Sequence, residues 1–491
     1  MTVVRRQGIK NTIYGYFGIL LGILSTIYIQ PFFLTKEQIG LTRTILSSAI
    51  ILSVISNLGS TIVNIKFLPN FYNPQKKHYG FFTIVVLFPL LGFTLCCLFI
   101  LIFKQHILNF YSINSSILLQ YFYPILLITF FNCMVLSFST YCNAINKSSL
   151  ATFVNEIINR TGYIICILLF SYGILTQTAY LYLLSIVYFV QLTLLFSIIS
   201  YYDYPTFKLS FLKKNIHLKK IVVFGLTSSF MQITGVGLKF IDVIFVGKYE
   251  SMKQVGIYSI AAFIGLVLET PLNAVERIAG PKISKLFIEN NLNEIEKIYT
   301  LSTKYLMVFC GLMGSILVVC IKPTLALLPN DYSSGSIVTI IICVGAFFNA
   351  ATGVNYSIIM YSKYYKISAI FYSLLLIITI SLYVLLIPIR GIMGAAIATC
   401  LASVIHNLLR FIFIKRKLNM QPFNIDSLKV ILIIAITVLL GFYIVIENNY
   451  LLILVRGTLT ALVFIVLLIV LKVFSIKEIK EEISSIKKTF N

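Results

Sequence analysis

The sequence lacks the common signatures of an enzyme. Its 491 residues contain no G-x-S-x-G, no H-E-x-x-H, no Walker A motif and no dinucleotide-binding glycine motif. Its nine cysteines fall in apolar runs without C-x-x-C spacing, so neither a zinc site nor a disulfide framework is indicated. The polar segments are too short to fold as a soluble catalytic domain. We therefore predict that the protein is not an enzyme and that it needs no metal and no cofactor.

Basic residues are in excess, but they form no basic tract. The net charge is +23, and the lysines and arginines are spread over short loops without interleaved aromatic residues, which argues against nucleic acid as a partner. With the N-terminus assigned to the cytoplasm, 26 of them lie on the cytoplasmic side and 7 on the opposite side, which predicts that both termini are cytoplasmic. Tryptophan is absent, and we interpret the 30 tyrosines and 39 phenylalanines mostly as lipid-facing or interfacial residues.

Apolar residues dominate the chain. It is 59% hydrophobic with a mean hydropathy of +0.95, too apolar for a soluble globular protein. About fourteen apolar segments reach the roughly 20 residues that cross a bilayer as a helix, so we predict an all-α integral membrane protein. The first run has no small-residue cleavage site, and we expect it to stay as a span. The expected spans are about 8–33, 41–65, 80–103, 118–142, 149–172, 178–201, 221–246, 254–280, 298–321, 335–361, 367–387, 391–414, 428–446 and 450–473.

Three short motifs recur at a nearly constant distance. They are Gln38–Leu41 with Gln254–Ile257 at an offset of 216, Phe130–Asn132 with Phe347–Asn349 at 217, and Gly173–Leu175 with Gly391–Met393 at 218. The shared order predicts two six-helix lobes related by a pseudo-two-fold axis along the membrane normal. Chance recurrence of apolar words is the alternative. The expected parts are lobes 1–201 and 221–414, a basic cytoplasmic linker 202–220, two added spans in 426–474, and an amphipathic cytoplasmic tail 475–491.

One face of the first span recurs in the seventh. The first-span face consists of Asn11, Gly15, Gly18, Gly22 and Ser25, and the seventh-span face consists of Ser228, Gln232, Gly235, Lys239 and Asp242. Steps of three and four place each set on one side of a helix. We interpret the two faces as the lining of a cavity between the lobes.

Polar and charged residues inside spans are costly, so they are candidates for function. The predicted substrate-binding residues, expected to contact pyrophosphate or sugar, are Arg43, Asn57, Lys239, Asn273 and Arg277. The possible ion-coupling residues are Asp242, which lies on the repeated face of the seventh span, and Glu269 and Glu276, which share one face of the eighth span. Two carboxylates on one dry face raise the pKa of at least one of them. Structural pairing is the alternative for Lys239 with Asp242, for Arg277 with a carboxylate, and for Glu156 with Arg160, which are four residues apart.

Three further basic residues are given structural interpretations. His406 is expected to be a packing histidine rather than a residue that titrates in function. Arg410 and Arg456 lie near predicted helix ends, and we expect their side chains to reach the head-group region.

Four stretches carry a family resemblance. They are Gly8–Asn11, Leu34–Leu41, Ser362–Tyr365 and, above all, Gly391–Thr399. Together they resemble the bacterial polysaccharide-export proteins, which are O-antigen-type lipid-linked oligosaccharide flippases of the multidrug/oligosaccharidyl-lipid/polysaccharide exporter superfamily. The resemblance extends over essentially the whole chain.

This resemblance implies a transporter of the bacterial inner membrane. It implies two lobes around a V-shaped cavity, alternating access, and a glycan carried on undecaprenyl pyrophosphate, with Arg43 and Arg277 holding the pyrophosphate. It also implies that the two added helices form a groove for the lipid tail. Possible partners are a polysaccharide polymerase and chain-length machinery. The first span lacks the charged pair of the peptidoglycan-precursor branch, which argues against lipid II as the substrate.

Two other functions stay open. A cation-coupled multidrug exporter of the same superfamily is favoured by Asp242, Glu269 and Glu276. A polyprenyl-linked glycosyltransferase or polymerase is the least favoured, because the sequence offers no external catalytic domain.

Overall fold

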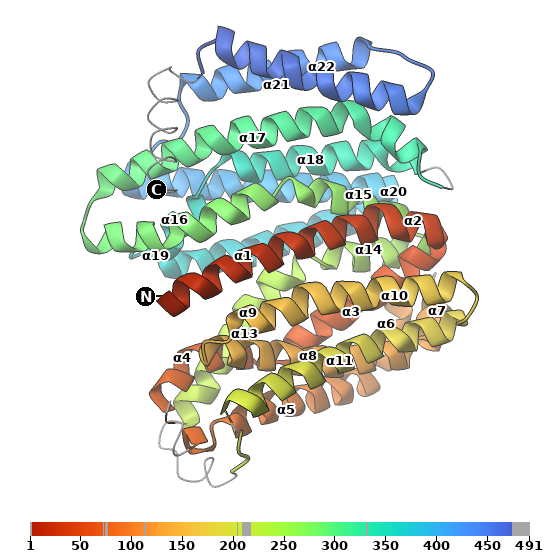
Figure 1. Ribbon diagram of the computed structural model, residues 1–491, viewed down its shortest axis with the longest axis vertical. Coiled ribbons are helices and arrows are strands. Elements are labelled where there is room, and N and C mark those ends of the chain that lie inside the picture. The colour runs from red at the N-terminus through yellow and green to blue at the C-terminus, as the bar shows by residue number, and fades with distance from the viewer. Residues whose placement is uncertain are drawn as a thin grey trace. The chain divides into compact units, whose positions relative to one another are not determined.

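The structure, a computed structural model, describes residues 2–71, 73, 77–111, 114–203, 205–208, 218–329 and 332–473. Within these ranges the chain forms helices and turns and no β-strand (Figure 1). The α-helices up to residue 267 are α1 (Thr2–Ile23), α2 (Gln30–Phe33), α3 (Lys36–Ser56), α4 (Ser60–Phe71), α5 (Phe82–Ile102), α6 (Lys104–Phe110), α7 (Ser115–Gln120), α8 (Phe122–Ala144), α9 (Ser148–Phe153), α10 (Asn159–Ser171), α11 (Gln177–Asp203), α13 (Leu218–Gly237), α14 (Ile241–Tyr249) and α15 (Met252–Val267).

The later α-helices are α16 (Thr270–Ile288), α17 (Leu292–Ala326), α18 (Ser336–Ala351), α19 (Asn355–Tyr361), α20 (Tyr365–Leu418), α21 (Ile425–Tyr443) and α22 (Asn449–Val470). Two π-helical segments, η1 (Leu24–Ile29) and η4 (Val154–Ile158), interrupt the first and fifth predicted spans. Two short 3₁₀ segments are η2 (Lys77–Gly80) and η5 (Ser333–Gly335). The predicted tail 475–491 and most of the predicted linker, 204 and 209–217, lie outside the described residues.

The described helices include 11 that are long and apolar enough to cross a membrane, or 13 if each of two bent pairs is one span. The pairs are α13 with α14, bent by 60°, and α15 with α16, bent by 43°. In that number α20 counts once, although its 54 residues far exceed the roughly 20 that a span needs. The hydroxyls of Tyr383 and Thr399 in α20 are 2.9 Å apart, whereas sixteen residues of straight helix would separate them by about 24 Å. Hence α20 folds back on itself as two spans, in agreement with the fourteen expected, and the all-α membrane fold is confirmed.

Gly391 makes this reversal possible. Its backbone angles, φ 57° and ψ −139°, belong to a region that glycine alone adopts at low cost. A Cβ atom on Gly394 would collide with the carbonyl group of Leu386 in the first arm, and Ala395 and Ala396 are fully buried. The small residues of the stretch Gly391–Thr399 therefore allow both the turn and the close packing of its two arms.

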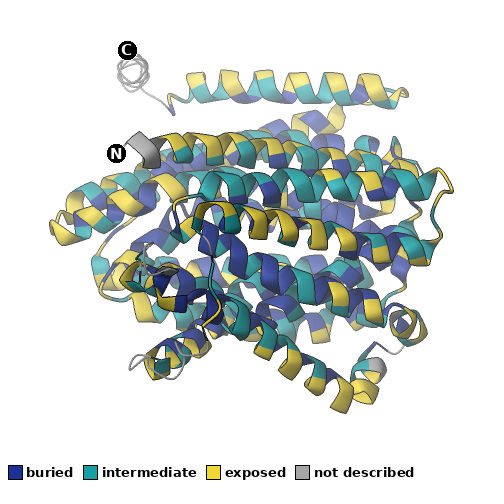
Figure 2. Cartoon of the chain, turned by 60° about the horizontal axis from the view of Figure 1, so that its bottom comes forward, coloured by how far each residue is buried: buried dark blue, intermediate teal, exposed yellow. Residues whose placement is uncertain are grey.

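The membrane-facing surface shows in the exposure pattern of single helices. On α5 the residues Leu91, Leu95, Leu98 and Ile102 are all exposed, at steps of four, three and four. Such steps place them on one helical face. Figure 2 shows exposed residues alternating with buried ones along the helices in this way. Large apolar side chains on outward faces are stable in lipid, where water does not penalise them.

Two prolines inside helices leave carbonyl groups that other helices satisfy. Proline has no N–H, so the residue four positions earlier loses its intrahelical donor. Pro89 in α5 leaves the Val85 carbonyl, which accepts from the Ser137 hydroxyl of α8 at 2.7 Å. Pro323 in α17 leaves the Val319 carbonyl, which accepts from Nη1 of Arg456 in α22 at 2.8 Å.

The expectation that Arg456 reaches the head groups stays a prediction, and the structure shows which groups hold its guanidinium. Besides the Val319 carbonyl, its guanidinium donates to the Ile444 carbonyl, just past the end of α21, at 2.8 and 3.1 Å. Carbonyl groups at a helix end have no intrahelical donor, so a nearby cation satisfies them. Arg456 thus ties α22 to α17 and to the end of α21.

The chain divides into two compact units, Met1–Ile260 and Ala261–Asn491. Because the division falls inside α15, the first unit contains α13 and α14 as well as the first six spans. Close glycine contacts explain this: a Cβ atom on Gly40 of α3 would collide with the Met252 carbonyl, and one on Gly256 would collide with the Lys36 carbonyl. These two glycines are equivalent in the internal repeat. The lobe boundaries drawn from the sequence stay a prediction.

In the second unit, α21 and α22 pack along α17 (Figure 1). The buried Lys304 of α17 forms an ion pair with Asp426 at 3.1 Å, and Lys429 approaches the same carboxylate at 3.3 Å. Asp426 lies in the first turn of α21, where a carboxylate interacts favourably with the helix dipole. The two added helices are thus fixed to the unit by charge as well as by apolar packing.

Candidate functional site

Arg43 of α3 is half-buried inside the first unit. Its Nη2 donates to Thr26 Oγ1 at 2.8 Å and to Gln30 Oε1 at 3.4 Å. Both partners are uncharged, and among the described residues no carboxylate forms an ion pair with this guanidinium. The Nε of Arg43 and the Nε2 of the fully buried Gln30 have no hydrogen-bond partner within the same residues. This cation, with spare donors around it, is an arrangement that an anionic ligand would complete.

The ion pair of Glu156 and Arg160 lies beside the glycine face of the first span. Arg160 donates from Nε at 3.2 Å and from Nη2 at 3.1 Å to the same oxygen, Oε2 of Glu156. A Cβ atom on Gly18 would lie 2.6 Å from the Glu156 carboxylate, and one on Gly22 would collide with the Arg160 guanidinium. The two glycines therefore make room for this pair, and the predicted pairing of Glu156 with Arg160 is confirmed.

Glu156 of η4, Arg160 of α10 and Arg43 of α3 lie in this order beside the first span. We name these three residues the charged column. They lie beside Gly18, Gly22 and the pair Thr26–Gln30, positions spaced by four residues. Residues four apart do not stay on one side of an α-helix, because it has 3.6 residues per turn. The wider π-helical turn of η1 helps to keep these positions on the same side. A second π-helical turn, η4, carries Glu156. Such turns are rare and occur frequently at functional sites.

Lys239 and Asp242 lie at the bend between α13 and α14. Lys239 is exposed, in the turn that joins the two helices. Asp242 accepts from its neighbour's N–H, Val243, at 2.8 Å and from the Tyr258 hydroxyl at 3.0 Å. Within the described residues no ion pair joins Lys239 to Asp242, so the geometry gives Lys239 no structural role and gives Asp242 two neutral donors.

The candidate residues near the bend between α15 and α16 differ in exposure. Asn273 and Arg277 are exposed, whereas Glu269 and Glu276 are partly buried. Oε1 of Glu269 accepts from Asn349 of α18 at 3.0 Å. No ion pair links Arg277 to either carboxylate in the part of the chain that the structure describes. Arg277 thus presents its charge outward, and Glu269 is held inside the second unit.

Glu269 belongs to a network of amides in the second unit. Asn349 Oδ1 accepts from Asn407 of α20 at 3.1 Å, and Asn407 Oδ1 accepts from both Thr352 and Asn355 at 3.1 Å. The network joins α16, α18, α19 and α20.

Asn57, another predicted substrate residue, is fully buried between helices. Its Nδ2 donates to the Cys133 carbonyl of α8 at 3.0 Å, and its Oδ1 accepts from the Thr61 N–H at the start of α4 at 3.1 Å. Both ends of the amide are therefore engaged in holding the break between α3 and α4 against α8. We accordingly leave Asn57 out of the proposed site.

Arg410 is 5% exposed, so the expectation that it reaches the head groups is wrong. Its guanidinium lies 5.4 Å from the ring centre of Tyr356 and 5.1 Å from that of Tyr372, as in cation–π interactions. Glu276 lies within electrostatic reach of it. His406, one turn earlier, packs against the rings of Phe371 and Tyr372, in line with its predicted packing role.

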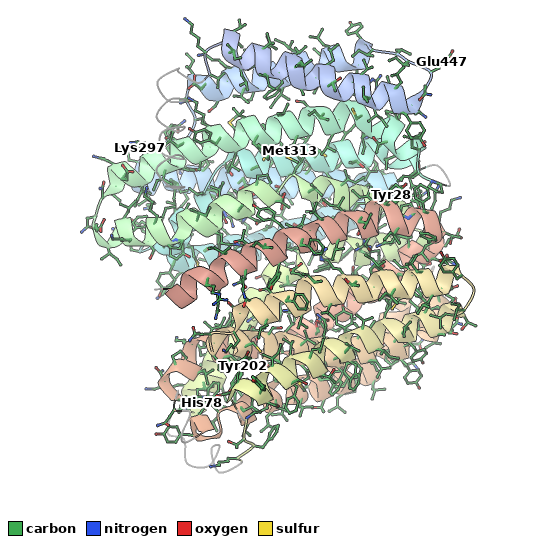
Figure 3. The ribbon with its side chains drawn as sticks, viewed as in Figure 1. Tyr28, His78, Tyr202, Lys297, Met313 and Glu447 are labelled. Atoms are coloured by element: carbon green, nitrogen blue, oxygen red, sulfur yellow. The ribbon has the colours of Figure 1, made fainter. Side chains whose placement is uncertain are left out.

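A buried polar cluster at one end of the first unit was missed by the sequence analysis. Asp203, the last residue of α11, accepts from the Tyr141 hydroxyl and binds the His78 ring. His78 and Tyr79 both have positive φ, 48° and 55°, a costly conformation for residues with a side chain. Figure 3 shows His78 close to Tyr202, the residue before Asp203. Because 125 residues separate His78 from Asp203, no local pattern could have indicated the contact.

The chain is similar to known proteins both in sequence and in structure. No protein-family profile matches the chain. It is 29% identical over 178 residues to the "Probable flippase AglR" of Haloferax volcanii, covering 34% of this chain and 36% of that protein. It is 28% identical over 177 residues to the "Capsular polysaccharide biosynthesis protein CapF" of Staphylococcus aureus, covering 35% and 42%. The matched segments thus span well under half the length of these relatives.

Solved structures cover far more of the chain. The inward-closed lipid II flippase MurJ matches with a TM-score of 0.75 at 16% identity, covering 94% of this chain and 99% of that one. An inward-facing multidrug resistance MATE transporter of the MOP superfamily matches at 0.64 with 13% identity, covering 82% and 94%. The chain shares the fold of MurJ and of this MATE transporter. This fold agrees with the one expected from the resemblance. Within the described residues no group of three or more His, Cys, Asp or Glu side chains could hold a metal ion.

Proposed function

We propose that this protein is a flippase that moves a lipid-linked oligosaccharide from the inner to the outer leaflet of a bacterial cytoplasmic membrane. The cargo is a repeat unit on undecaprenyl pyrophosphate, destined for O-antigen, capsule or exopolysaccharide. Both termini face the cytoplasm, and a polymerase and chain-length proteins act on the product. The fold shared with MurJ and the partial similarity to AglR and CapF support the class of transporter.

One observation carries the proposal: the half-buried Arg43 guanidinium has only uncharged partners among the described residues. Placing a cation inside a membrane protein costs at least a few kcal/mol. A structural arginine in such a place is usually paired with a carboxylate or with carbonyl groups, as Arg456 is with the carbonyls of Val319 and Ile444. A pyrophosphate would supply the missing negative charge. We therefore assign the anionic head group of the cargo to Arg43.

The exposed basic residues Lys239 and Arg277, with the exposed amide of Asn273, extend the proposed site. They offer charge and hydrogen bonds to phosphate and sugar during alternating access between the lobes. Asp242 and Glu269 are each bound by neutral donors, and with Glu276 they are the groups that would couple transport to a cation. The lipid tail would remain in the bilayer beside α21 and α22.

The test is translocation by purified protein in liposomes, using a defined lipid-linked sugar. We expect the wild type to flip it and the double variant Arg43→Ala with Arg277→Ala to lose at least tenfold in rate. Arg390→Ala, which removes another exposed arginine, is the matched control and should keep the rate. Normal translocation by a well-folded double variant would show that the assigned site is wrong.

A cation-coupled drug exporter is the second candidate. The fold similarity to the MATE transporter and the partly buried carboxylates Glu269 and Glu276 support it. A deletion strain that became sensitive to cationic dyes while keeping its surface polysaccharide would favour this function over the flippase.

A further inference from the structure

We propose that Glu156 and Arg160 form a releasable ion pair in which Arg160 exchanges the Glu156 carboxylate for a phosphoryl oxygen of the cargo. This inference rests on the proposed function and adds a second anion-binding residue to it. Arg160 would hold one phosphoryl group while Arg43 holds the other. Glu156 would act as an internal competitor that keeps Arg160 neutralised when no cargo is present.

The geometry of the pair allows one anion to replace another. Both hydrogen bonds from Arg160 end on one oxygen, Oε2 of Glu156, instead of forming two parallel bonds to two oxygens. The Nη1 atom takes no part in the ion pair and lies against Gly22 of the first span, so an anion would bind Arg160 by taking the place of the Glu156 oxygen. The two side chains are 33% and 35% exposed, so a ligand can reach them without unfolding the unit. A purely structural arginine–carboxylate pair would gain from the bidentate form that this pair lacks.

The place of the pair in the charged column points to the same role. Arg160 lies beside Gly22 and Arg43 beside Thr26, one step of four residues along the first span. Four residues of a helix rise by about 6 Å, so the positions beside the two arginines are on the order of 6 Å apart along that span. Gln30 adds a buried, unpaired Nε2 next to Arg43. The column thus offers two cations and further donors in a row, with one carboxylate at its end, which suits a ligand with two adjacent phosphoryl groups.

The glycine face of the first span gives a way to displace Arg160 without removing its charge. A Cβ atom on Gly22 would collide with the guanidinium, whereas one on Gly15 meets nothing within 4 Å. Gly22→Ala should therefore push Arg160 from its place. Gly15→Ala is the matched control on the same face, and both changes raise helix propensity.

The experiment is equilibrium binding of undecaprenyl pyrophosphate to the full chain in nanodiscs. We expect Glu156→Gln to bind about tenfold more tightly than wild type, because it removes the competitor, and Arg160→Gln to bind about tenfold more weakly, since hydrogen bonds to charged groups are worth roughly 1.5–3 kcal/mol. Gly22→Ala should weaken binding as Arg160→Gln does, and Gly15→Ala should not. The double variant Glu156→Gln with Arg160→Gln should bind like Arg160→Gln alone.

The outcomes separate this inference from the proposed function. If the wild type binds the probe and Arg43→Gln weakens binding, but the Glu156, Arg160 and Gly22 variants leave it unchanged, the pair is structural and only this inference fails. If the folded wild type does not bind the probe at all, both fail. Thermal unfolding of each variant, recorded in parallel, identifies any loss of binding that comes from loss of the fold.

Discussion

Two asparagines that the internal repeat makes equivalent have different partners in the two units. Asn132 in the first unit donates to the Ser53 hydroxyl at 2.7 Å. Asn349 in the second unit donates to the Glu269 carboxylate at 3.0 Å. Ser53 and Glu269 are themselves separated by the repeat offset of 216 residues. The same helix contact is therefore built twice, once with neutral groups and once around a charge.

The arginines within spans also have different partners in the two units. In the second unit Arg410 is enclosed by Tyr356 and Tyr372, with Glu276 nearby. In the first unit Arg43 is half-buried, and its hydrogen bonds go to uncharged side chains. The comparison teaches that an arginine within a span is not by itself evidence of binding. Among the described residues each of the two keeps one buried donor without a hydrogen-bond partner, Nη2 of Arg410 and Nε of Arg43, so what distinguishes them is the carboxylate and the two rings beside Arg410.

The largest expected effect compares the equivalent turns at Gly391 and Gly173. Both have positive φ, but Gly391 also has ψ −139° and turns between closely packed arms, whereas a Cβ atom on Gly173 meets nothing within 4 Å. Gly391→Ala should prevent normal folding, with a cost of about 3 kcal/mol or more. Gly173→Ala should cost roughly 1 kcal/mol. The yield of monodisperse protein in size-exclusion chromatography checks both, and equal yields would contradict the assigned hairpin.

Replacing Arg410 or Arg43 by methionine tests the difference between the two arginines. Arg410→Met removes two cation–π contacts and leaves Glu276 without its nearby cation, so we expect a loss of about 2–4 kcal/mol in unfolding free energy. Arg43→Met should change stability by less than about 1 kcal/mol, because no ion pair is broken. Thermal unfolding in detergent measures both. A larger loss for Arg43→Met would mean that Arg43 serves the fold.

The asparagine pair gives the smallest expected difference. Asn349→Ala removes one hydrogen bond to the Glu269 carboxylate and one from the Asn407 amide, which should cost about 2–3 kcal/mol. Asn132→Ala leaves only a hydroxyl, at about 1 kcal/mol. The same unfolding assay compares the two losses of stability. A larger loss for Asn132→Ala than for Asn349→Ala would contradict the view that the second-unit contact is the one built around a charge.

Much of the fold followed from the sequence because apolar length is a local signal. The expected spans needed only neighbouring residues, and Gly173 and Gly391 were noted from the sequence as equivalent positions of the repeat before the structure showed that both have positive φ. The partners of charged residues are not local. Gly18 and Gly22 were assigned to a cavity lining because their own helix cannot show that Glu156 and Arg160 lie against them.

The candidate site was predictable in part for the same reason. Position within a span marked Arg43 as costly, and the structure adds that its partners are neutral. The burial of Arg410 depends on Tyr356 and Tyr372, 54 and 38 residues earlier in the chain. Position near a helix end suggested the opposite.

The central claim is that Arg43 is kept for an anionic ligand. Its most direct test is the thermal unfolding of wild type and Arg43→Met with and without undecaprenyl pyrophosphate. A ligand at about a hundredfold excess over its Kd stabilises the folded state by roughly 2.7 kcal/mol, so we predict that the unfolding temperature of the wild type rises by several degrees and that of Arg43→Met hardly changes. An equal rise in both proteins would contradict the claim.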